Sequence, residues 1–140
     1  SFFLGDRDLT SNFALKKACE RAYKRAGITD PKSAFDVIEL SDQYAYQLPM
    51  WAEGMGLGEE GKGAAWLNAG GMEKQNVNTS GGMLAGNPLI LGGLVRAAEA
   101  AFQLRGEAGD RQVENAKTAI AHGVMGPAGQ FHSVVTLERD

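Results

Sequence analysis

The stretch from residue 76 to residue 93 reads Asn-Val-Asn-Thr-Ser-Gly-Gly-Met-Leu-Ala-Gly-Asn-Pro-Leu-Ile-Leu-Gly-Gly, a glycine-rich loop that leads directly into a helical pattern. Glycine permits sharp turns and lets a ligand approach the backbone closely. A helix start adds unpaired backbone N–H groups and the positive end of the helix dipole. Pro88 suits the first helical position and makes Asn87 the expected N-cap. The stretch therefore predicts a helix start at which backbone donors meet a carbonyl oxygen or an oxyanion.

The helix that follows is the longest element that the sequence predicts. It continues to about Leu104. We expect its inward-facing stripe to consist of Leu91, Leu94, Val95, Ala98 and Phe102. Residues 105–115 are polar and rich in turn formers, which predicts a surface loop. Residues 117–121 and 131–138 are typical of two strands, and they flank a glycine loop at 123–129.

On the N-terminal side of the opening stretch, helical and strand patterns alternate. Thr10 or Ser11 can cap a helix that ends at Gly27, because small and apolar residues recur at helical spacing between these points. Residues 35–40 are typical of a buried strand, and a short helix is expected over residues 48–55.

A long glycine-rich connection containing Trp66 joins this part to the opening stretch, and its length marks it as more than an incidental loop. The predicted order of elements is helix, strand, helix, helix, strand, strand. Such alternation predicts one α/β domain over residues 1–140, a layered mixed sheet with helices on its faces. In such a domain, ligands are favoured at strand ends and helix starts.

The composition excludes several classes of protein. The net charge of −3 and the scattered Lys and Arg residues argue against nucleic-acid binding. No apolar run approaches the length of a membrane-spanning helix, and no signal-peptide pattern opens the chain. The single cysteine, Cys19, cannot form an internal disulfide. We therefore expect a cytoplasmic protein without membrane insertion.

The sequence contains no motif for a metal or a nucleotide. Its 2 histidines and 1 cysteine are scattered, so a zinc site would need carboxylates to complete it. The glycine-rich stretch lacks the lysine of a phosphate loop and the glycine spacing of a dinucleotide fold. We expect no metal and no bound prosthetic group.

Three motifs, in order, resemble the C-terminal half of thiolase-superfamily proteins, most closely the sterol-carrier or lipid-transfer type. The first, Val37-Ile-Glu-Leu-Ser-Asp-Gln-Tyr44, stands where that family has a strand and a His-Asp-Cys-Phe-like turn. The second, Asn78-Thr-Ser-Gly-Gly82 leading to Gly86-Asn-Pro-Leu89, is similar to Asn-x-x-Gly-Gly followed by Gly-His-Pro-Leu-Gly. The third is Leu104-Arg-Gly-Glu-Ala-Gly-Asp-Arg-Gln-Val113 followed by Ile120-Ala-His-Gly123. Together these motifs span nearly all of the chain.

The resemblance implies a five-layered fold built from two similar halves, of which this chain supplies the second. In the family, the first half carries the cysteine that becomes acylated. The second half contributes the Gly-His-Pro histidine and a late cysteine that transfers a proton. Such enzymes make or break a carbon–carbon bond next to a coenzyme A thioester and stabilise an enolate oxygen with fixed donors. The resemblance therefore implies a coenzyme A thioester substrate and a partner carrying the N-terminal half.

The departures from the family concern its catalytic groups. Asn87 stands where the family has histidine, and an amide donates a hydrogen bond but cannot exchange a proton near neutral pH. Residues 123–126, where the late cysteine would fall, contain no thiol. Ser41 and Gln43 replace the histidine and cysteine of the first motif. Any acid or base must therefore come from elsewhere in the protein.

The catalytic candidates are Tyr44, Tyr46 and His122, with Asn87 as an oxyanion donor. Each has a structural alternative. One tyrosine can lie in the core and the other at the rim, and His122, placed at the end of a strand beside the glycine loop, can serve as a proton shuttle or bind the backbone. Asp42 can cap the short helix after the first strand or act as a base. Residues expected to contact substrate are Ser41, Asp42, Asn78, Gly81, Gly82, Gly86, Gly123 and Gly126.

Two classes of function follow. In the first, the chain is part of an enzyme that cleaves or forms a carbon–carbon bond in an acyl-CoA, by retro-aldol or Claisen-type chemistry. A retro-aldol reaction suits the sequence because it requires no acyl-cysteine. In the second, the chain is a non-catalytic lipid-transfer or scaffold component that completes a two-subunit thiolase-like complex.

Partners follow from the same resemblance. Some relatives act with a small acyl-CoA-binding protein that carries an OB fold and a zinc ribbon, so such a partner is expected here as well. Since an isolated half would leave apolar surface uncovered, we also expect a homodimer or a larger complex. A third interpretation is that the 140 residues are a piece of a longer protein.

Overall fold

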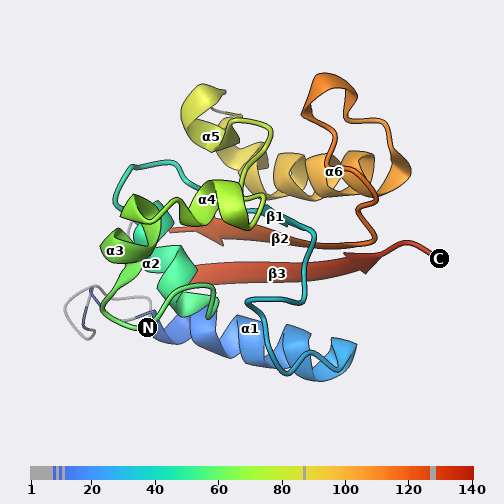
Figure 1. The fold of residues 1–140 in the computed structure, drawn as a ribbon. Coiled ribbons are helices and arrows are strands. Elements are labelled where there is room, and N and C mark those ends of the chain that lie inside the picture. Colours follow the sequence, from blue (N-terminus) through green and yellow to red (C-terminus); the bar gives the residue numbers. More distant parts are fainter. Residues whose placement is uncertain (1–7, 9, 11, 87, 127–128) are drawn as a thin grey trace.

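The computed structural model describes residues 8, 10, 12–86, 88–126 and 129–140 (Figure 1). Its helices and strands are α1 (Phe13–Ala26), β1 (Val37–Glu39), α2 (Gln47–Gly54), α3 (Gly63–Asn68), α4 (Gly71–Lys74), α5 (Gly82–Ala85), the 3-10 helix η2 (Leu89–Leu91), α6 (Gly92–Arg105), the 3-10 helix η3 (Gly109–Arg111), β2 (Thr118–Met125) and β3 (Phe131–Glu138). This mixture of helices and strands confirms the predicted α/β class.

The described strands form one mixed sheet in the order β1-β2-β3. β1 runs parallel to β2, with Ile38 opposite Ile120. β3 runs antiparallel to β2, with Val134 opposite His122. A single bridge between Ile38 and Val77 attaches the start of the glycine-rich loop to the free edge of β1. The sheet therefore places the exit of β1, the glycine-rich loop and the end of β2 near one another.

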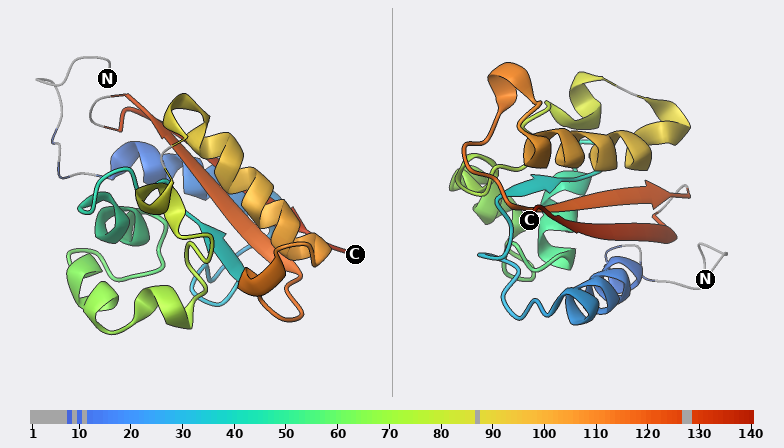
Figure 2. Two further views of the ribbon diagram at one scale, coloured as in Figure 1. Left: turned by 90° about the horizontal axis from the view of Figure 1, so that it is seen from above. Right: turned by 90° about the vertical axis from the view of Figure 1, so that its right-hand side faces the viewer.

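Helices cover both faces of this sheet. α6 lies along one face, and α1 and α2 lie against the other (Figures 1 and 2). On the α6 side, Ala119 and Ala121 of β2 pack with Ala100 and Leu104. The core on the opposite side consists of Leu15, Cys19, Ile38, Leu40, Leu48, Trp51, Ala52, Met55, Leu57, Val77 and Ile120. Alternate residues of β2 thus face different layers, as expected for a strand buried on both faces.

α1 ends where the sequence predicts, but its N-cap residue differs from the prediction. Gly27 ends α1 in the left-handed conformation, with φ of 69°. Asn12, rather than Thr10, occupies the N-cap position, and its side chain donates to the carbonyl oxygen of Met50 at 2.8 Å instead of capping. Ser11, the other predicted cap, lies outside the described residues. Here a tertiary hydrogen bond has displaced the local capping bond.

The connection that contains Trp66 is not a long loop, because it includes the short helices α3 and α4. The indole N–H of Trp66 donates to the side-chain oxygen of Gln75 at 3.1 Å. A Cβ atom on Gly71 would overlap the indole ring, and one on Gly58 would lie 3.3 Å from the side chain. These two glycines make room for the tryptophan.

α6 differs most from its prediction. It begins at Gly92 after η2, so Pro88 is not its first residue. Leu94 and Phe102 of the expected inner stripe are 68% and 41% exposed, whereas Arg96 and Gln103 are buried. The stripe was therefore wrong, and the helix turns an apolar face outward.

β2 is longer than predicted and extends through Gly123 to Met125. Gly123 therefore lies within a strand and not in the glycine loop. A Cβ atom on Gly123 would lie 3.0 Å from the Cα atom of Gly93 in α6. This pair of glycines lets α6 approach the sheet closely.

Candidate functional site

Three segments that are distant in sequence surround a cleft of about 380 Å³. They are the exit of β1, the start of α6 with η2, and the end of β2. The residues that line the cleft are Gln43, Tyr44, Ile90, Gly92, Gly93, Val124, Met125 and Gly126. A second hollow of about 350 Å³ shares part of this lining and extends the apolar surface toward Phe131 and Ser133. The first motif thus contributes Gln43 and Tyr44 to the cleft, and the other lining residues directly follow the second motif and the end of the third.

The two candidate tyrosines lie on the surface beside this cleft. Tyr44 is 59% exposed and Tyr46 is 57% exposed, so the expected division into a core and a rim tyrosine is wrong. Their rings stack at a centroid distance of 5.9 Å. Only Tyr44 belongs to the cleft lining. Their catalytic role stays a prediction.

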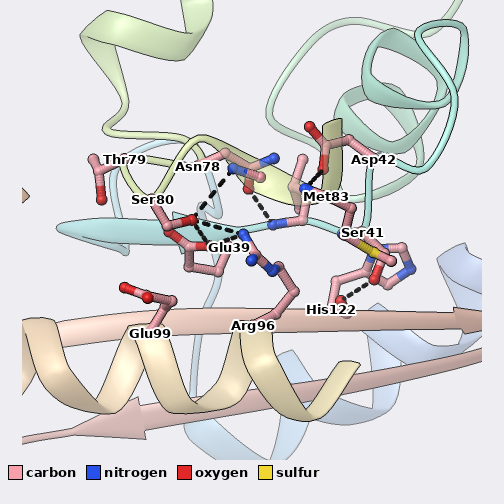
Figure 3. Close-up of polar contacts among 12 residues, drawn as sticks. Glu39, Ser41, Asp42, Asn78, Thr79, Ser80, Met83, Arg96, Glu99 and His122 are labelled. Atoms are coloured by element: carbon pink, nitrogen blue, oxygen red, sulfur yellow. Dashed lines mark hydrogen bonds and ion pairs between the residues drawn. The ribbon is translucent and has the colours of Figure 1, made fainter. Parts of the chain in front are cut away.

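Asp42 is a helix cap, but for a different helix from the one predicted. Its carboxylate Oδ1 accepts the backbone N–H of Met83 at 2.6 Å, in the first turn of α5 (Figure 3). No side chain among the described residues caps α2, whose N-cap position is Tyr46. Since Asp42 is buried, this bond fixes the glycine-rich loop to the exit of β1.

The predicted glycine requirement holds for part of the glycine-rich loop. Gly81 and Gly82 have φ of 90° and 68°, which side-chain-bearing residues rarely adopt. A Cβ atom on Gly82 would also overlap the carboxylate of Asp42. Gly86, by contrast, is extended, with φ of −151° and open space around its Cα. The backbone at Gly86 therefore does not require glycine.

Asn78 attaches the glycine-rich loop to the segment of β1 through both its side chain and its backbone. Its side-chain Oδ1 accepts the backbone N–H of Leu40 at 2.6 Å, and its backbone N–H donates to the carbonyl oxygen of Ile38 at 2.8 Å. Asn78 is 5% exposed, and its φ of 51° lies in the left-handed region that asparagine tolerates. In this structure Asn78 supports the loop, and a contact with substrate stays a prediction.

A buried ion pair beneath this loop was missed by the sequence analysis. Nη1 of Arg96 lies 2.6 Å from Oε2 of Glu39 and donates to Oγ of Ser80 at 2.7 Å (Figure 3). Burial raises the pKa of the Glu39 carboxyl, while the neighbouring Arg96 opposes that shift. Among the described residues, Oε1 of Glu39 and Nε of Arg96 have no hydrogen-bond partner. The sequence signal that could have indicated this pair is one charged residue in each of two apolar stretches, Glu39 in residues 37–40 and Arg96 in residues 94–98.

His122 lies within β2, not at its end, and it is fully buried. Its ring packs edge-on against Trp51 of α2 at a centroid distance of 5.7 Å, whereas the next residue, Gly123, approaches α6. His122 is therefore on the sheet face opposite α6. Burial, with a smaller contribution from the neighbouring His132, lowers the pKa of His122 to about 3. Its role as a proton shuttle stays a prediction.

Ser41 is tied to His122 and not exposed to the cleft. Its Oγ donates to the carbonyl oxygen of His122 at 2.8 Å (Figure 3), and its own carbonyl oxygen accepts the indole N–H of Trp51 at 2.8 Å. Gly126, with φ of 96°, does line the cleft. Asn87, the predicted oxyanion donor, lies outside the described residues.

Two other findings concern metals and membranes. Across the described parts of the chain, His, Cys, Asp and Glu side chains form no group of three that could hold a metal ion. Of the helices described, none combines the length and apolarity needed to cross a bilayer. The predicted compartment stays a prediction.

The chain is similar to known proteins over nearly its full length. A family described as thiolase C-terminal domain-like matches residues 3–139. Sterol carrier protein 2 of Oryctolagus cuniculus is 42% identical over 126 residues, which cover 87% of this chain and 22% of that protein. An acetyl-CoA acetyltransferase of Methanothermobacter thermautotrophicus is 36% identical over 127 residues, covering 88% of this chain and 33% of that protein.

A solved structure agrees with these relatives. An Ltp2-ChsH2(DUF35) aldolase matches with a TM-score of 0.72 and 19% identity, over 89% of this chain and 31% of that chain. At this identity the match shows the fold alone. The chain spans between 22% and 33% of the length of the two relatives above. The resemblance inferred from the three motifs is thus confirmed, and the chain belongs to the thiolase C-terminal domain-like family.

Proposed function

We propose that this chain is the C-terminal part of a thiolase-like enzyme that cleaves or forms the carbon–carbon bond beside a coenzyme A thioester by aldol chemistry. The observation that carries the proposal is the cleft, where the exit of β1, the start of α6 and the end of β2 converge. Tyr44 is the one ionisable side chain among the described residues of its lining. The acid and base of the reaction are therefore assigned to the phenol of Tyr44.

The chemistry can proceed without the thiols that the sequence lacks. In the cleavage direction, the base takes the proton of the β-hydroxyl group. The bond between Cα and Cβ then breaks, and its electron pair moves into the thioester as an enolate. The α-carbon takes up a proton, which leaves a carbonyl compound and a shortened acyl-CoA. Atoms and electrons balance, and no acyl-enzyme or redox partner is required.

The first turn of α6 suits the enolate oxygen. Gly92 and Gly93 line the cleft, and the N-cap residue Leu91 makes no side-chain capping bond. The first N–H groups of a helix have no intrahelical acceptor, and the dipole makes this end positive. Fixed donors at the place where charge develops stabilise a transition state more than a ground state. The oxyanion-donor role that the sequence predicts for Asn87 is kept as part of the proposal.

The proposal requires other polypeptide segments. The exposed apolar side chains of η2 and α6, among them Ile90 and Leu94, favour a partner surface at the rim of the cleft. We assign this surface to the N-terminal thiolase half, present as another segment or another chain. The aldolase of similar fold is named with two components, Ltp2 and ChsH2(DUF35), which supports a partner chain here as well. We propose that this partner is the small acyl-CoA-binding protein that the family resemblance implies.

The proposal is tested by incubating the chain and the polypeptide carrying the N-terminal half with a β-hydroxyacyl-CoA. We expect cleavage to a carbonyl compound and a shorter acyl-CoA. The substitution Tyr44→Phe retains the ring stack but removes the phenol, and we expect it to lower kcat by about 100-fold or more. Tyr46→Phe is the matched control, since Tyr46 does not line the cleft, and we expect little change. Equal effects of the two substitutions would refute the assignment of Tyr44.

The second candidate is a non-catalytic lipid-transfer or scaffold component. It is favoured by the full burial of His122, which keeps its ring from a substrate, and by the apolar residues Ile90, Val124 and Met125 that line both hollows. For this function we expect saturable binding of an acyl-CoA by the assembled complex without turnover. That binding would be unchanged by Tyr44→Phe.

A further inference from the structure

Side chains from β1, from the exit of β1 and from α6 hold residues 78–83 of the glycine-rich loop, which we call the 78–83 segment. The carboxylate of Asp42, just after β1, accepts the backbone N–H at the end of this segment at 2.6 Å. Oγ of Ser80, in its middle, lies between Glu39 of β1 and Arg96 of α6 (Figure 3). The segment is therefore attached both to β1 and to α6.

The hydroxyl group of Ser80 uses all of its hydrogen-bonding capacity. It donates to Oε2 of Glu39 at 3.0 Å, and it accepts from Nη1 of Arg96 at 2.7 Å and from the backbone N–H of Gly82 at 3.3 Å. A hydroxyl group offers one donor and two acceptor sites, so these three bonds fill them. One oxygen atom therefore joins β1, the first residue of α5 and α6.

Burial makes these bonds strict constraints on position. The side chains of Glu39 and Arg96 are 0% and 3% exposed, and Nη1 of Arg96 also donates to Oε2 of Glu39 at 2.6 Å. The planar guanidinium group fixes the directions of its N–H bonds. Without the hydroxyl group of Ser80, an N–H of Arg96 and the N–H of Gly82 would lose their acceptor. Because an unpaired buried donor costs more than a typical hydrogen bond contributes, we expect the 78–83 segment to shift.

The face of α6 that meets the 78–83 segment includes a residue of the cleft lining. Arg96 lies four residues after Gly92, and residues at this spacing are neighbours on one face of a helix. A Cβ atom on Gly92 would lie 2.5 Å from Cε of Met83, so the side chain of Met83 packs on the backbone of Gly92. Gly92 itself lines the cleft. The segment therefore supports the start of α6 directly through Met83, and through Ser80 by way of Arg96.

We propose that Ser80 is a positioning residue, whose hydroxyl group fixes the start of α6 relative to β1 and so sets the position of Gly92 in the cleft. The sequence predicts substrate contacts for Asn78, Gly81 and Gly82 and indicates no role for Ser80. The importance of this position for catalysis rests on the proposed function, which places the enolate oxygen at the start of α6. The position itself can be measured without a substrate.

The first experiment compares Ser80→Ala and Ser80→Thr with the unmodified chain, using the backbone amide NMR signals of the ¹⁵N-labelled proteins. Ser80→Ala removes the hydroxyl group, and we expect the signals of Gly82, Gly92 and Gly93 to shift. Ser80→Thr keeps the hydroxyl group on a half-buried residue, and we expect most of the shift at Gly92 and Gly93 to be reversed. Unchanged signals at these two glycines in Ser80→Ala, or equal shifts in both variants, would overturn the proposal.

Thr79→Val is the matched control, because it removes the neighbouring hydroxyl group of the same segment. Oγ1 of Thr79 accepts from Nε2 of Gln103 at 3.0 Å, and Nε2 keeps a second acceptor in the carbonyl oxygen of Arg111 at 2.6 Å. We expect amide shifts at Gly92 that are several-fold smaller in Thr79→Val than in Ser80→Ala. Shifts of equal size would show that the start of α6 responds to any lost hydroxyl group in the segment, and the proposal would fail.

The second experiment measures cleavage of a β-hydroxyacyl-CoA by the chain together with the polypeptide carrying the N-terminal half. We expect Ser80→Ala to lower kcat by about 10-fold or more with a smaller change in KM, and Ser80→Thr to restore most of it, because a displaced oxyanion donor weakens the transition state. A kcat unchanged in Ser80→Ala would contradict the inference. Absence of cleavage by the unmodified proteins would refute the proposed function instead, and the amide signals would then decide the role of Ser80.

Discussion

At the scale of single residues, a buried neutral histidine makes stability depend on pH. The ordinary pKa of 6.5 applies to His122 in the unfolded chain, whereas burial lowers the folded value to about 3. Between these values the unfolded chain binds the additional proton. The contribution of His122 is therefore complete above pH 6.5 and is lost as the pH falls toward 3. We expect it to change the free energy of unfolding by about 1.4 kcal/mol per pH unit in this window.

Urea unfolding at pH 7, 6 and 5 measures this slope, with His122→Gln as the variant that cannot titrate. The raised pKa of Glu39 acts in the opposite direction, because its contribution is lost as the pH rises. That contribution is common to both proteins and cancels in the difference of their slopes. If the two proteins lose stability in parallel between pH 7 and pH 5, the buried histidine is not the cause.

Two glycines of the same loop should respond differently to alanine. Gly82 has φ of 68° and faces the carboxylate of Asp42, while Gly86 is extended and open. We expect Gly82→Ala to lower the free energy of unfolding by about 1–3 kcal/mol, and Gly86→Ala to change it by less than about 0.5 kcal/mol. Thermal unfolding of the two variants checks this, and similar losses would contradict the local geometry.

At the scale of elements, α6 is held to β1 by the ion pair of Arg96 and Glu39, whose side chains are 3% and 0% exposed. Arg96→Met would leave Glu39 buried without its partner, and we expect a loss of about 3–5 kcal/mol. The double variant Arg96→Met, Glu39→Leu should recover most of that loss, since it leaves no unpaired charge.

The ion pair between Arg111 and Glu99 offers a control within the same chain. Arg111 is 46% exposed there, so Arg111→Met should cost no more than about 1 kcal/mol. Chemical denaturation of the unmodified chain, Arg96→Met, the double variant and Arg111→Met gives the four free energies of unfolding to compare. A loss in Arg96→Met no larger than in Arg111→Met would show that the buried pair does not hold the helix.

The same helix shows why periodicity was insufficient for some elements. Its end near Leu104 could be predicted from local pattern, because helix formation depends on nearby residues, whereas its start at Gly92 was not predicted. Its buried face could not be predicted in this way. Two tertiary contacts decide which face is buried. Gly93 packs closely on Gly123 of β2, and Arg96 pairs with Glu39 of β1. Leu94 and Phe102 were assigned inward because hydrophobicity alone does not distinguish a core from a partner surface.

In the candidate site, too, some features follow from local sequence pattern and others depend on tertiary contacts. The general expectation that ligands bind at strand ends and helix starts agrees with a cleft lined by Tyr44, Gly92 and Gly126, while the roles of the predicted site residues stay predictions. The faces of individual side chains depend on strand register. Because β2 continues through Gly123, His122 lies inside the strand, and its ring packs against Trp51 on the face opposite α6. No local sequence pattern specifies this placement.

At the scale of the whole molecule, the exposed apolar residues predict association. Ile90, Leu91 and Leu94 are 97%, 53% and 68% exposed on adjoining turns of η2 and α6. We expect the isolated chain to self-associate in a sedimentation velocity dilution series. Leu94→Gln should shift the distribution toward monomer without lowering the melting temperature, since Leu94 packs little. Leu48→Gln, in the core, should instead unfold the protein. A monomer at all concentrations would refute the predicted oligomer.

Trp51 gives the molecule an optical probe at its centre. The indole touches both imidazoles and binds the exit of β1, so its emission is sensitive to the charge of the rings and to the position of that segment. Trp66, the second tryptophan, lies away from them beside Gly58 and Gly71 and can be replaced by phenylalanine to isolate the signal. Time-resolved fluorescence could then follow, in native conditions and without a substrate, how often the cleft walls separate.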